Sequence, residues 1–471
     1  MRNFIKVIAI ILLLAFAFCA CSTEETETVP VYDNDIGAEH DMNGQVIRWG
    51  FGKSLNDEEN VFGFIPGTEF ADMALERQKE IEKTYNCSIV MTYKDLVSNL
   101  DDNLYATMSG DSIYDILNNE SIKLINHIRA GYILPLSGLL DITNTEKWGT
   151  PNMLLSLVWN NDLYGVLPYA WPELMYSSFG YLIAVNENLV SQFGLGDPRE
   201  YVEKNELTWD KFEEVLHVYT RTEGERTVYG MATHSAYFAM MMFLSNGVGV
   251  SDYIDGQVVA GAYTDAGFEA LTRAQKIYTE TCRDCFHPEN ATYGSLNAFK
   301  AGESVMATAH ASYASGFIGH DDSIMYVMDN VGVLPYPVGP NAEPGVYKGY
   351  HESMYFTASI PITSRDYEAA AFIIDAMFEP FKGFETKESI VEYMTNQFFF
   401  DERDTRVFMN CLRYTEYGFY TEGARDQIAA AVDSSTPISQ LLERYQDKYD
   451  KIVQDYMVNH YNSMISIFGE Q

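Results

Sequence analysis

The sequence has few positive charges and lacks the motifs of common catalytic and nucleotide-binding sites. Its 471 residues include 31 lysines and arginines against 67 aspartates and glutamates, a formal net charge of −36. So little positive charge leaves nothing to neutralise phosphates, and we expect no nucleic-acid partner. The patterns G-x-S-x-G, H-E-x-x-H, G-x-x-x-x-G-K-[ST] and G-x-G-x-x-G are missing. We therefore expect a protein that is not an enzyme.

Cysteine is also scarce, with six residues in the chain. Cys282 and Cys285 form one C-x-x-C pair, but no second pair of cysteines or histidines follows at zinc-site spacing. A local disulfide and two buried thiols both remain open for this pair. The nine histidines are scattered singly. We expect no metal and no cofactor.

Hydrophobic residues, in contrast, are plentiful. They make up 47% of the chain, and aromatic residues make up 14%. This composition supports sizeable cores and argues against general disorder. The length predicts two or three domains with a soluble, acidic surface.

Residues 1–20 have the pattern of a signal peptide. Arg2 and Lys6 give a positive start, and residues 7–20 follow as fourteen residues without a charge. Such a stretch is shorter than the roughly 20 residues of a membrane-spanning helix and typical of a signal-peptide core. Ala20 precedes Cys21 as the small residue of a bacterial lipobox does, and this resemblance implies cleavage before Cys21 and its lipidation. Phe18 stands where an aliphatic residue is usual, so an ordinary cleaved signal peptide is the alternative.

Residues 21–44 are predicted to form a lipidated, flexible tether. From residue 22 to residue 44 the stretch contains seven acidic residues, no lysine or arginine and few apolar residues. It has too little apolar surface to order itself. The run DNDIG at 33–37 faintly resembles a calcium loop but lacks its ligand spacing and terminal glutamate.

The body of the chain alternates between strand and helix patterns. Strands are predicted at 46–49, 88–91 and 113–117, with helix-like sequence between them. This alternation predicts an α/β domain with a mostly parallel sheet. A second unit of the same kind follows, with predicted strands at 181–185, 305–308 and 331–335.

Two helix starts and a long C-terminal helix are also predicted. Thr208 caps a helix that places apolar residues at 212, 215, 216 and 219, and another helix covers 369–378. Near the end, Thr436 is the predicted cap and Pro437 the first helical residue. The apolar stripe that follows, from residue 438 to residue 456, is predicted to pack in the core.

Several segments together resemble one family, the extracellular solute-binding proteins of bacterial ABC transporters, including the maltose- and oligosaccharide-binding proteins. The segments lie in the family's order and span residues 45–375. They are SGD with YDI at 109–116, GYILPL at 131–136, NDLYGVLP at 161–168, VNENL at 185–189, TWDKF at 208–212, FKAGESVM at 299–306, and GVLP to GP at 332–340.

The resemblance implies a two-lobed, periplasmic-binding-protein-like α/β fold of type II with a hinge. Each lobe would be a mostly parallel sheet flanked by helices. The first lobe would comprise residues 45–171 and 339–380, and the second residues 172–338 and 381–471. A small-molecule solute, here a carbohydrate and most simply an oligosaccharide, would bind between the lobes and pass to an ABC permease. We expect a monomer, lipid-anchored to the cell membrane and facing outward.

The same resemblance implies a set of ligand contacts. Lys53 follows the first strand, three residues follow the 115–116 strand, and two lie at the first lobe crossing. Further candidates lie in the second lobe, where a contact glutamate and a stacking tryptophan of the family are absent. The full set is Lys53, Asn118, Asn119, Glu120, Trp171, Glu173, His234, Tyr237, His310, Tyr313, Tyr350, His351 and Glu352.

Other functions remain open at this stage. The same fold could bind a peptide, a polyamine or another solute, and the acidic composition would suit a cation. A sensor-linked binding protein would pass its signal to a receptor. A surface glycosidase would need a fixed pair of carboxylates, which the sequence does not single out among 67 acidic residues.

Overall fold

The computed structural model describes most of the chain beyond residue 40. The described residues are 41–53, 61–64, 66–172, 181–249, 251–284, 291–310, 324, 328–351, 356–386, 388–390, 392–393, 401–413, 415–417, 431–432 and 434–469. At several range edges only the backbone is described, including Lys53, His310, Tyr350 and His351. Cys21, the predicted signal peptide and the tether up to residue 40 lie outside the described residues.

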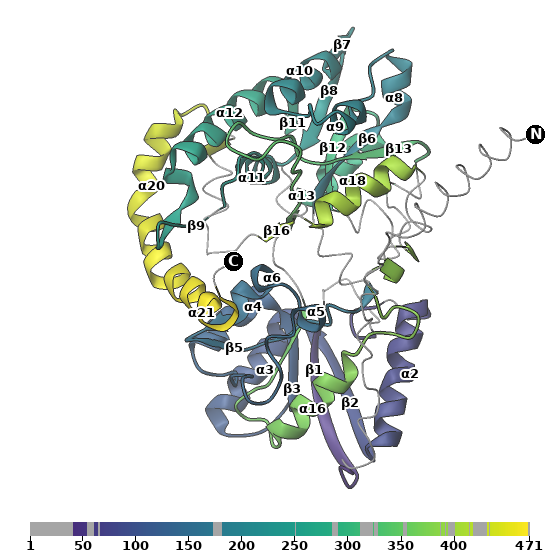
Figure 1. Ribbon diagram of the computed structural model, residues 1–471, viewed down its shortest axis with the longest axis vertical. Coiled ribbons are helices and arrows are strands. Elements are labelled where there is room, and N and C mark those ends of the chain that lie inside the picture. The colour runs from purple at the N-terminus through teal and green to yellow at the C-terminus, as the bar shows by residue number, and fades with distance from the viewer. Residues whose placement is uncertain are drawn as a thin grey trace, which may run out of the picture. The chain divides into compact units, whose positions relative to one another are not determined.

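A four-stranded sheet in the order β15-β3-β1-β2 organises what we call the first lobe (Figure 1). Its strands are β1 (Gln45–Lys53), β2 (Cys87–Asp95), β3 (Ile116–Glu120) and β15 (Phe356–Ser359). β1 pairs in parallel with β2 and β3, whereas β15 runs antiparallel to β3. The predicted strands at 46–49 and 88–91 are confirmed. The third strand begins three residues later than predicted.

The helices between these strands follow the apolar pattern of the sequence. They are α2 (Glu69–Thr84), α3 (Leu96–Ser109), α4 (Ser121–Arg129) and, after β15, α16 (Tyr367–Met377). The short helices α5 (Thr145–Trp148) and α6 (Pro151–Leu154), the turn η1 (Leu155–Leu157) and the hairpin β4 (Val158–Trp159) and β5 (Asp162–Leu163) follow α4. Asp366 caps α16 by accepting a hydrogen bond from the backbone of Ala369, at 3.0 Å.

An eight-stranded sheet in the order β11-β8-β12-β6-β14-β16 organises the second lobe. β13 also pairs with β6, and β7 with β8. The strands are β6 (Tyr181–Asn186), β7 (Arg221–Glu223), β8 (Arg226–Thr233), β11 (Cys282–Asp284), β12 (Ser304–His310), β13 (Val331–Leu334), β14 (Tyr350–His351) and β16 (Glu416–Tyr417). β6 runs antiparallel to β12, β13 and β14. The sheet is therefore mixed and not mostly parallel, because its buried central strand has the opposite direction to three neighbours.

The helices of the second lobe include the one predicted to start after Thr208. They are α8 (Glu187–Gln192), α9 (Arg199–Glu203), α10 (Trp209–Tyr219), α11 (Ser235–Ser245), α12 (Asp265–Thr281), α13 (Ala291–Lys300) and α18 (Glu402–Arg413), with the hairpin β9 (Ser251–Ile254) and β10 (Gln257–Ala260) and the turn η2 (Gly261–Tyr263). Thr208 caps α10 as predicted, and the predicted apolar positions of this helix are buried. Every residue of α11 is buried, which is typical of a helix inside a core.

The last part of the chain is one helical run in three sections. These are α20 (Ile438–Ile452), the π-helical segment η3 (Val453–Met457) and α21 (Val458–Phe468), yellow in Figure 1. Ile438, Leu441, Tyr449 and Ile452 are buried, so much of the predicted stripe packs in the core. Pro437 is the cap residue and not the first helical residue, because its backbone is extended.

The lobes exchange chain at different points from those predicted. Residues 339–351 lie with the second lobe, since Gly339 donates to the carbonyl of Ser245 and β14 pairs with β6. The crossing to the first lobe therefore comes between β14 and β15. Phe381 and Phe384 were predicted in the second lobe, but Phe381 stacks on Phe70 of the first lobe and Phe384 meets the same ring edge-on. In the part of the chain that is described, no helix is both long and apolar enough to cross a membrane.

Candidate functional site

The carboxyl ends of β1 and β3 bring one group of predicted site residues together. Because the two strands are parallel and neighbours, their ends meet at one edge of the sheet, where Phe51 pairs with Asn118. The backbone of Lys53 ends β1, and Asn118, Asn119 and Glu120 end β3. Four predicted contacts therefore share one edge of the first sheet.

Asn118 and Asn119 point to opposite faces of this sheet, as adjacent strand residues do. Asn119 is fully buried, and its amide donates to the Leu96 carbonyl at 3.0 Å and to Asn99 Oδ1 at 2.8 Å. A side chain at Gly52 would collide with this amide, since its Cβ would lie 2.7 Å away from Nδ2. Asn119 thus positions β3 against the start of α3.

Asn118 has different surroundings. It is 2% exposed, and among the described residues its Oδ1 accepts no hydrogen bond. A buried acceptor without a donor is costly, so such a group calls for a partner outside the described residues, such as a ligand hydroxyl. Glu120, two residues further along the strand, has a half-buried carboxylate 3.5 Å from Lys123 Nζ. Asn118 and Glu120 are the strongest ligand candidates of the first lobe.

Trp171 lies in an aromatic cluster of the first lobe. It is 1% exposed, its ring stacks on Phe381 at 4.6 Å, and its indole nitrogen donates to the Glu379 carbonyl at 3.1 Å. Phe64 and Phe378 contact the same ring. In this arrangement the side chain is part of the core, and its role as a ligand contact stays a prediction. Glu173 lies outside the described residues.

A second group of predicted residues gathers at the carboxyl end of β8. His234 follows β8 directly and caps α11, because its Nδ1 accepts a hydrogen bond from the Ala236 backbone at 3.0 Å. The neutral imidazole then carries its proton on Nε2. Tyr237 lies one turn into α11, with its ring centre 5.7 Å from that of His234. Both residues are buried.

Tyr181 joins this group, although the sequence predicted it only as a strand residue. Its ring stacks on Tyr237 with centres 4.2 Å apart. Its backbone pairs with His310 of β12 and with Tyr350 of β14. Three predicted contacts therefore surround one tyrosine that sequence reasoning missed, because only the antiparallel pairing of β6 brings it there. His351 follows in β14, while Tyr313 and Glu352 lie outside the described residues.

The opposite edge of the first sheet has a charge network with a structural role. Asp115 Oδ2 accepts hydrogen bonds from Arg48 Nε at 3.1 Å and Arg365 Nη2 at 3.0 Å. Burial by itself would raise the pKa of Asp115, but these bonds outweigh it and hold the pKa well below its usual range. The network fixes the start of β3 to β1 and to the chain before α16, and it leaves no general acid there.

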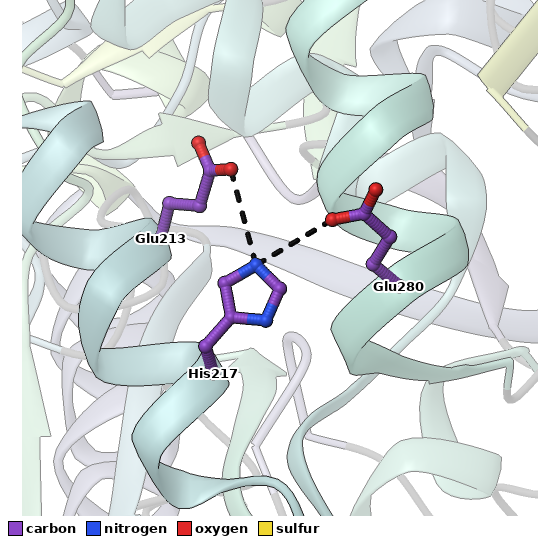
Figure 2. A group of neighbouring side chains, drawn as sticks. All are labelled: Glu213, His217 and Glu280. Carbon is purple, nitrogen blue, oxygen red and sulfur yellow. Dashed lines mark ion pairs between the residues drawn. The ribbon is translucent and has the colours of Figure 1, made fainter.

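One group of potential metal ligands lies away from these sites, on α10 and α12. His217 Nε2 is 3.9 Å from Glu213 Oε1 and 3.5 Å from Glu280 Oε2 (Figure 2). Glu213 already pairs with Lys276 at 2.6 Å and with Arg273 at 2.6 Å. Burial would raise the pKa of Glu213, but these two cations lower it. Because Lys276 holds the oxygen that a metal would need, the group is best described as an ion-pair network.

A pocket of about 810 Å³ lies on the same side of α10 and α12. Its walls include Trp209, Phe268, Pro340 and Pro344, and Arg273 and Lys276 lie at its polar part. None of the predicted site residues lines it. The polar side chains there pair with one another, as the contact of Arg273 with Asp210 at 2.5 Å illustrates. We therefore place the candidate site at the two strand edges.

Solved structures share this architecture over most of both chains. The GacH receptor of Streptomyces glaucescens, solved unliganded and with acarbose, aligns with a TM-score of 0.56 at 13% identity over 88% of this chain and 99% of its own. A cyclo/maltodextrin-binding protein complexed with maltotetraose aligns with a TM-score of 0.57 at 12% identity, over 88% and 97%. UgpB from Mycobacterium tuberculosis, in complex with glycerophosphocholine, aligns with a TM-score of 0.54 at 14% identity, over 82% and 96%.

This chain has the fold of the ABC solute-binding proteins. The two-lobed α/β architecture predicted from the resemblance is thereby confirmed. No family model matches the sequence, and no curated protein matches it either. The likeness to solute-binding proteins therefore rests on the architecture and on the sequence segments described above. The ligand has to be argued from the side chains at the strand edges.

Proposed function

We propose that this protein is the outward-facing substrate-binding component of an ABC importer and captures a carbohydrate between its lobes. The observation that carries the proposal is the grouping of polar and aromatic side chains at the strand edges of both lobes. The fold adds support, because neighbours of this fold were solved with acarbose and with maltotetraose. The protein binds its solute without converting it.

The side chains at the two edges suit a sugar. Sugars present hydroxyl groups, which pair with carboxylates and amides, and apolar ring faces, which stack on aromatic rings. The first lobe offers Asn118 Oδ1, which accepts no hydrogen bond among the described residues, and the Glu120 carboxylate. The second lobe offers the stacked rings of Tyr181 and Tyr237 beside His234. Together they supply both kinds of contact.

Dividing the contacts between two lobes gives the protein its mechanism. A solute that touches only one lobe gains part of the interaction free energy, and it gains the rest when the second lobe closes on it. Binding therefore favours the closed arrangement by the difference in affinity between the two states. An importer can recognise that closed arrangement as the loaded one. Lys53, His310, Tyr350 and His351 are the further contacts we propose at the same edges.

We place the protein at the outer face of the cell membrane. The proposed anchor is a lipid on Cys21, and residues 22–44 are the tether between this anchor and the first strand. The test is a Cys21→Ser variant, whose expected result is release of the protein from the membrane fraction into the soluble extracytoplasmic fraction. Unchanged membrane association of this variant would contradict lipid anchoring.

A second candidate is the same binding role for a solute that is not a sugar. UgpB, which shares the fold, was solved with glycerophosphocholine, a compound that combines hydroxyls with charged groups. Glu120 would suit the cationic part of such a solute. Peptides and polyamines belong to the same test.

A melting-temperature screen of residues 22–471 distinguishes these candidates. The panel contains maltose, maltotetraose, acarbose, ribitol and glycerophosphocholine, together with short peptides and polyamines. A ligand that binds only the folded state stabilises it by about 2.7 kcal/mol at a hundredfold excess over its dissociation constant. We expect a dose-dependent rise with one class of sugar, and chromatography of the mixture should recover that sugar intact. A rise only with glycerophosphocholine, peptides or polyamines would overturn the sugar, and products of hydrolysis would overturn the pure binding role.

A further inference from the structure

The C-terminal helical run contacts both lobes, and it has an irregular segment between its two regular parts. Regular α-helix ends at Ile452 and starts again at Val458. The π-helical segment η3 lies between them. A π-turn contains one residue more than an α-turn, and such segments are rare and often lie at functional positions.

The α20 section is held by the second lobe. Tyr263, the last residue of η2 just before α12, donates its hydroxyl to the Leu442 carbonyl at 2.9 Å, and its ring meets Tyr449 edge-on with centres 5.5 Å apart. Gln275 of α12 donates to the carbonyl of Thr436, just before α20, at 3.0 Å. Tyr449 is 2% exposed. This end of the run therefore moves with α12.

The α21 section makes four of its hydrogen bonds with the first lobe. The side chain of Asn459 accepts from the Asn160 backbone and donates to the Asn160 side chain, both at 2.9 Å. Ser463 accepts from the Asn161 backbone at 2.9 Å. His460 is 1% exposed and donates from Nδ1 to the Leu155 carbonyl at 3.0 Å. These contacts seat α21 on η1 and on the turn between β4 and β5.

Arg129, the last residue of α4, holds the π segment itself. Its guanidinium lies 3.7 Å over the ring of Tyr456 and 5.1 Å over that of Trp159, and it donates to the Asp455 carbonyl at 3.4 Å. The second lobe meets the run nearby, where Tyr461 donates to the Ser251 carbonyl of β9 at 2.9 Å. The irregular segment thus lies where contacts from the two lobes converge.

We propose that the C-terminal run is a strap that limits the relative motion of the lobes, with the π segment as its bending point. Both ends stay docked, so a change in the angle between the lobes has to be absorbed between them. We assign the bending to the π segment because the regular α-helical hydrogen-bond pattern is interrupted there. The inference rests on the proposed function in one respect, because solute capture is the process in which this motion would be used.

The chain supplies a matched pair of variants for the test. Gln454 and Asp455 are exposed in the π segment, and Gln446 and Asp447 are an exposed pair of the same residues in α20. Gln454→Gly with Asp455→Gly loosens the proposed bending point and keeps the backbone carbonyl that Arg129 uses. Gln446→Gly with Asp447→Gly makes the same chemical change where α12 holds the helix. Both variants lose equal intrinsic helix propensity.

The readout is the distance between spin labels on the two lobes in the protein without any ligand. Double electron–electron resonance measures it. Spin labels are attached at Asp101→Cys in α3 and Lys204→Cys after α9, both exposed, in a Cys285→Ser background. We expect the distance distribution to broaden at least twofold in the π-segment variant and to keep its width in the α20 variant. Circular dichroism confirms that both variants fold.

The strap proposal would be contradicted by equal widths of the distance distribution in wild type and both variants. Equal broadening in the two variants would also contradict it. An Arg129→Ala variant gives a second reading, since it should broaden the distribution without touching the helix sequence. No solute is present in this experiment, so its failure leaves the proposed function standing. Failure of the ligand screen would in turn leave this result unchanged.

Discussion

Asn118 and Asn119 are adjacent on β3, and their surroundings separate a ligand contact from a structural contact. Asn119 makes two buried hydrogen bonds, whereas Asn118 Oδ1 has no donor among the described residues. We expect Asn118→Ala to weaken solute binding by roughly five- to thirtyfold, with an unchanged melting temperature, since one lost hydrogen bond to a ligand costs about 1–2 kcal/mol. Calorimetry with the solute found in the screen and a melting curve measure the two effects.

The matched control is Asn119→Ala, which should have the opposite profile. Removing this amide leaves the Leu96 carbonyl and Asn99 without their donor, so we expect a loss of about 1–3 kcal/mol of folding free energy. Binding by the protein that remains folded should change little. A stable Asn118→Ala protein with full affinity would remove Asn118 from the site.

His460 makes the docking of α21 sensitive to acid. Burial lowers the pKa of its imidazole to about 4, from an ordinary value of 6.5, and the nearby charge of Arg129 adds to the effect. The folded protein therefore favours the neutral ring. The stability that this ring contributes is complete above pH 6.5 and is lost as the pH falls toward 4.

The corresponding variant is His460→Asn, which keeps an N–H donor for the Leu155 carbonyl and does not titrate. Between pH 7 and pH 4, wild type should lose up to about 3 kcal/mol more folding free energy than the variant, as the shift of the pKa implies. Urea unfolding midpoints at several pH values measure the difference, and the acidic residues common to both proteins cancel. Parallel pH profiles for the two proteins would show that His460 is not the group responsible.

At the scale of elements, one arginine joins α9, α8 and α18 beneath β13. Arg199 pairs with Glu187 at 2.8 Å, Asp197 at 2.9 Å and Asp404 at 3.1 Å. Asp404 also accepts from the Val333 backbone at 3.0 Å. Burial raises the pKa of Asp404 in spite of these partners. The packing of α18 on β13 thus depends on the buried carboxylate of Asp404, whose charge is stabilised by Arg199.

An Arg199→Met variant should therefore be strongly destabilised in a pH-dependent way. Leaving a buried charge without its partner costs about 3–5 kcal/mol. The penalty should be largest near pH 8 and shrink toward pH 5, because Asp404 can then take up a proton and become neutral. Chemical unfolding of both proteins at the two pH values measures it. An equal deficit at pH 8 and pH 5 would contradict the role given to Asp404.

Patterns of neighbouring residues predicted many of the helices and strands. They did not predict which strands, distant in the sequence, pair with one another. The cap of α10 and the strands β1 and β2 follow from neighbouring residues, and these were found. The mixed second sheet was not, because the direction of β6 depends on partners more than a hundred residues away. Tyr181 was missed for the same reason. Asn118 and Asn119 differ only in the face of the sheet they occupy, so the sequence named both.

The proposed solute capture would be a property of the whole molecule, because each lobe carries part of the proposed site. If the solute draws the lobes together, its saturation should reduce the radius of gyration in small-angle scattering. Asn118→Ala should reach the same compact state at solute concentrations higher in proportion to its weaker affinity, since the variant changes the binding free energy and not the closed arrangement. A saturated protein whose radius of gyration stays constant would mean that the solute binds one lobe alone. In that case the residues of the other lobe would have to be withdrawn from the site.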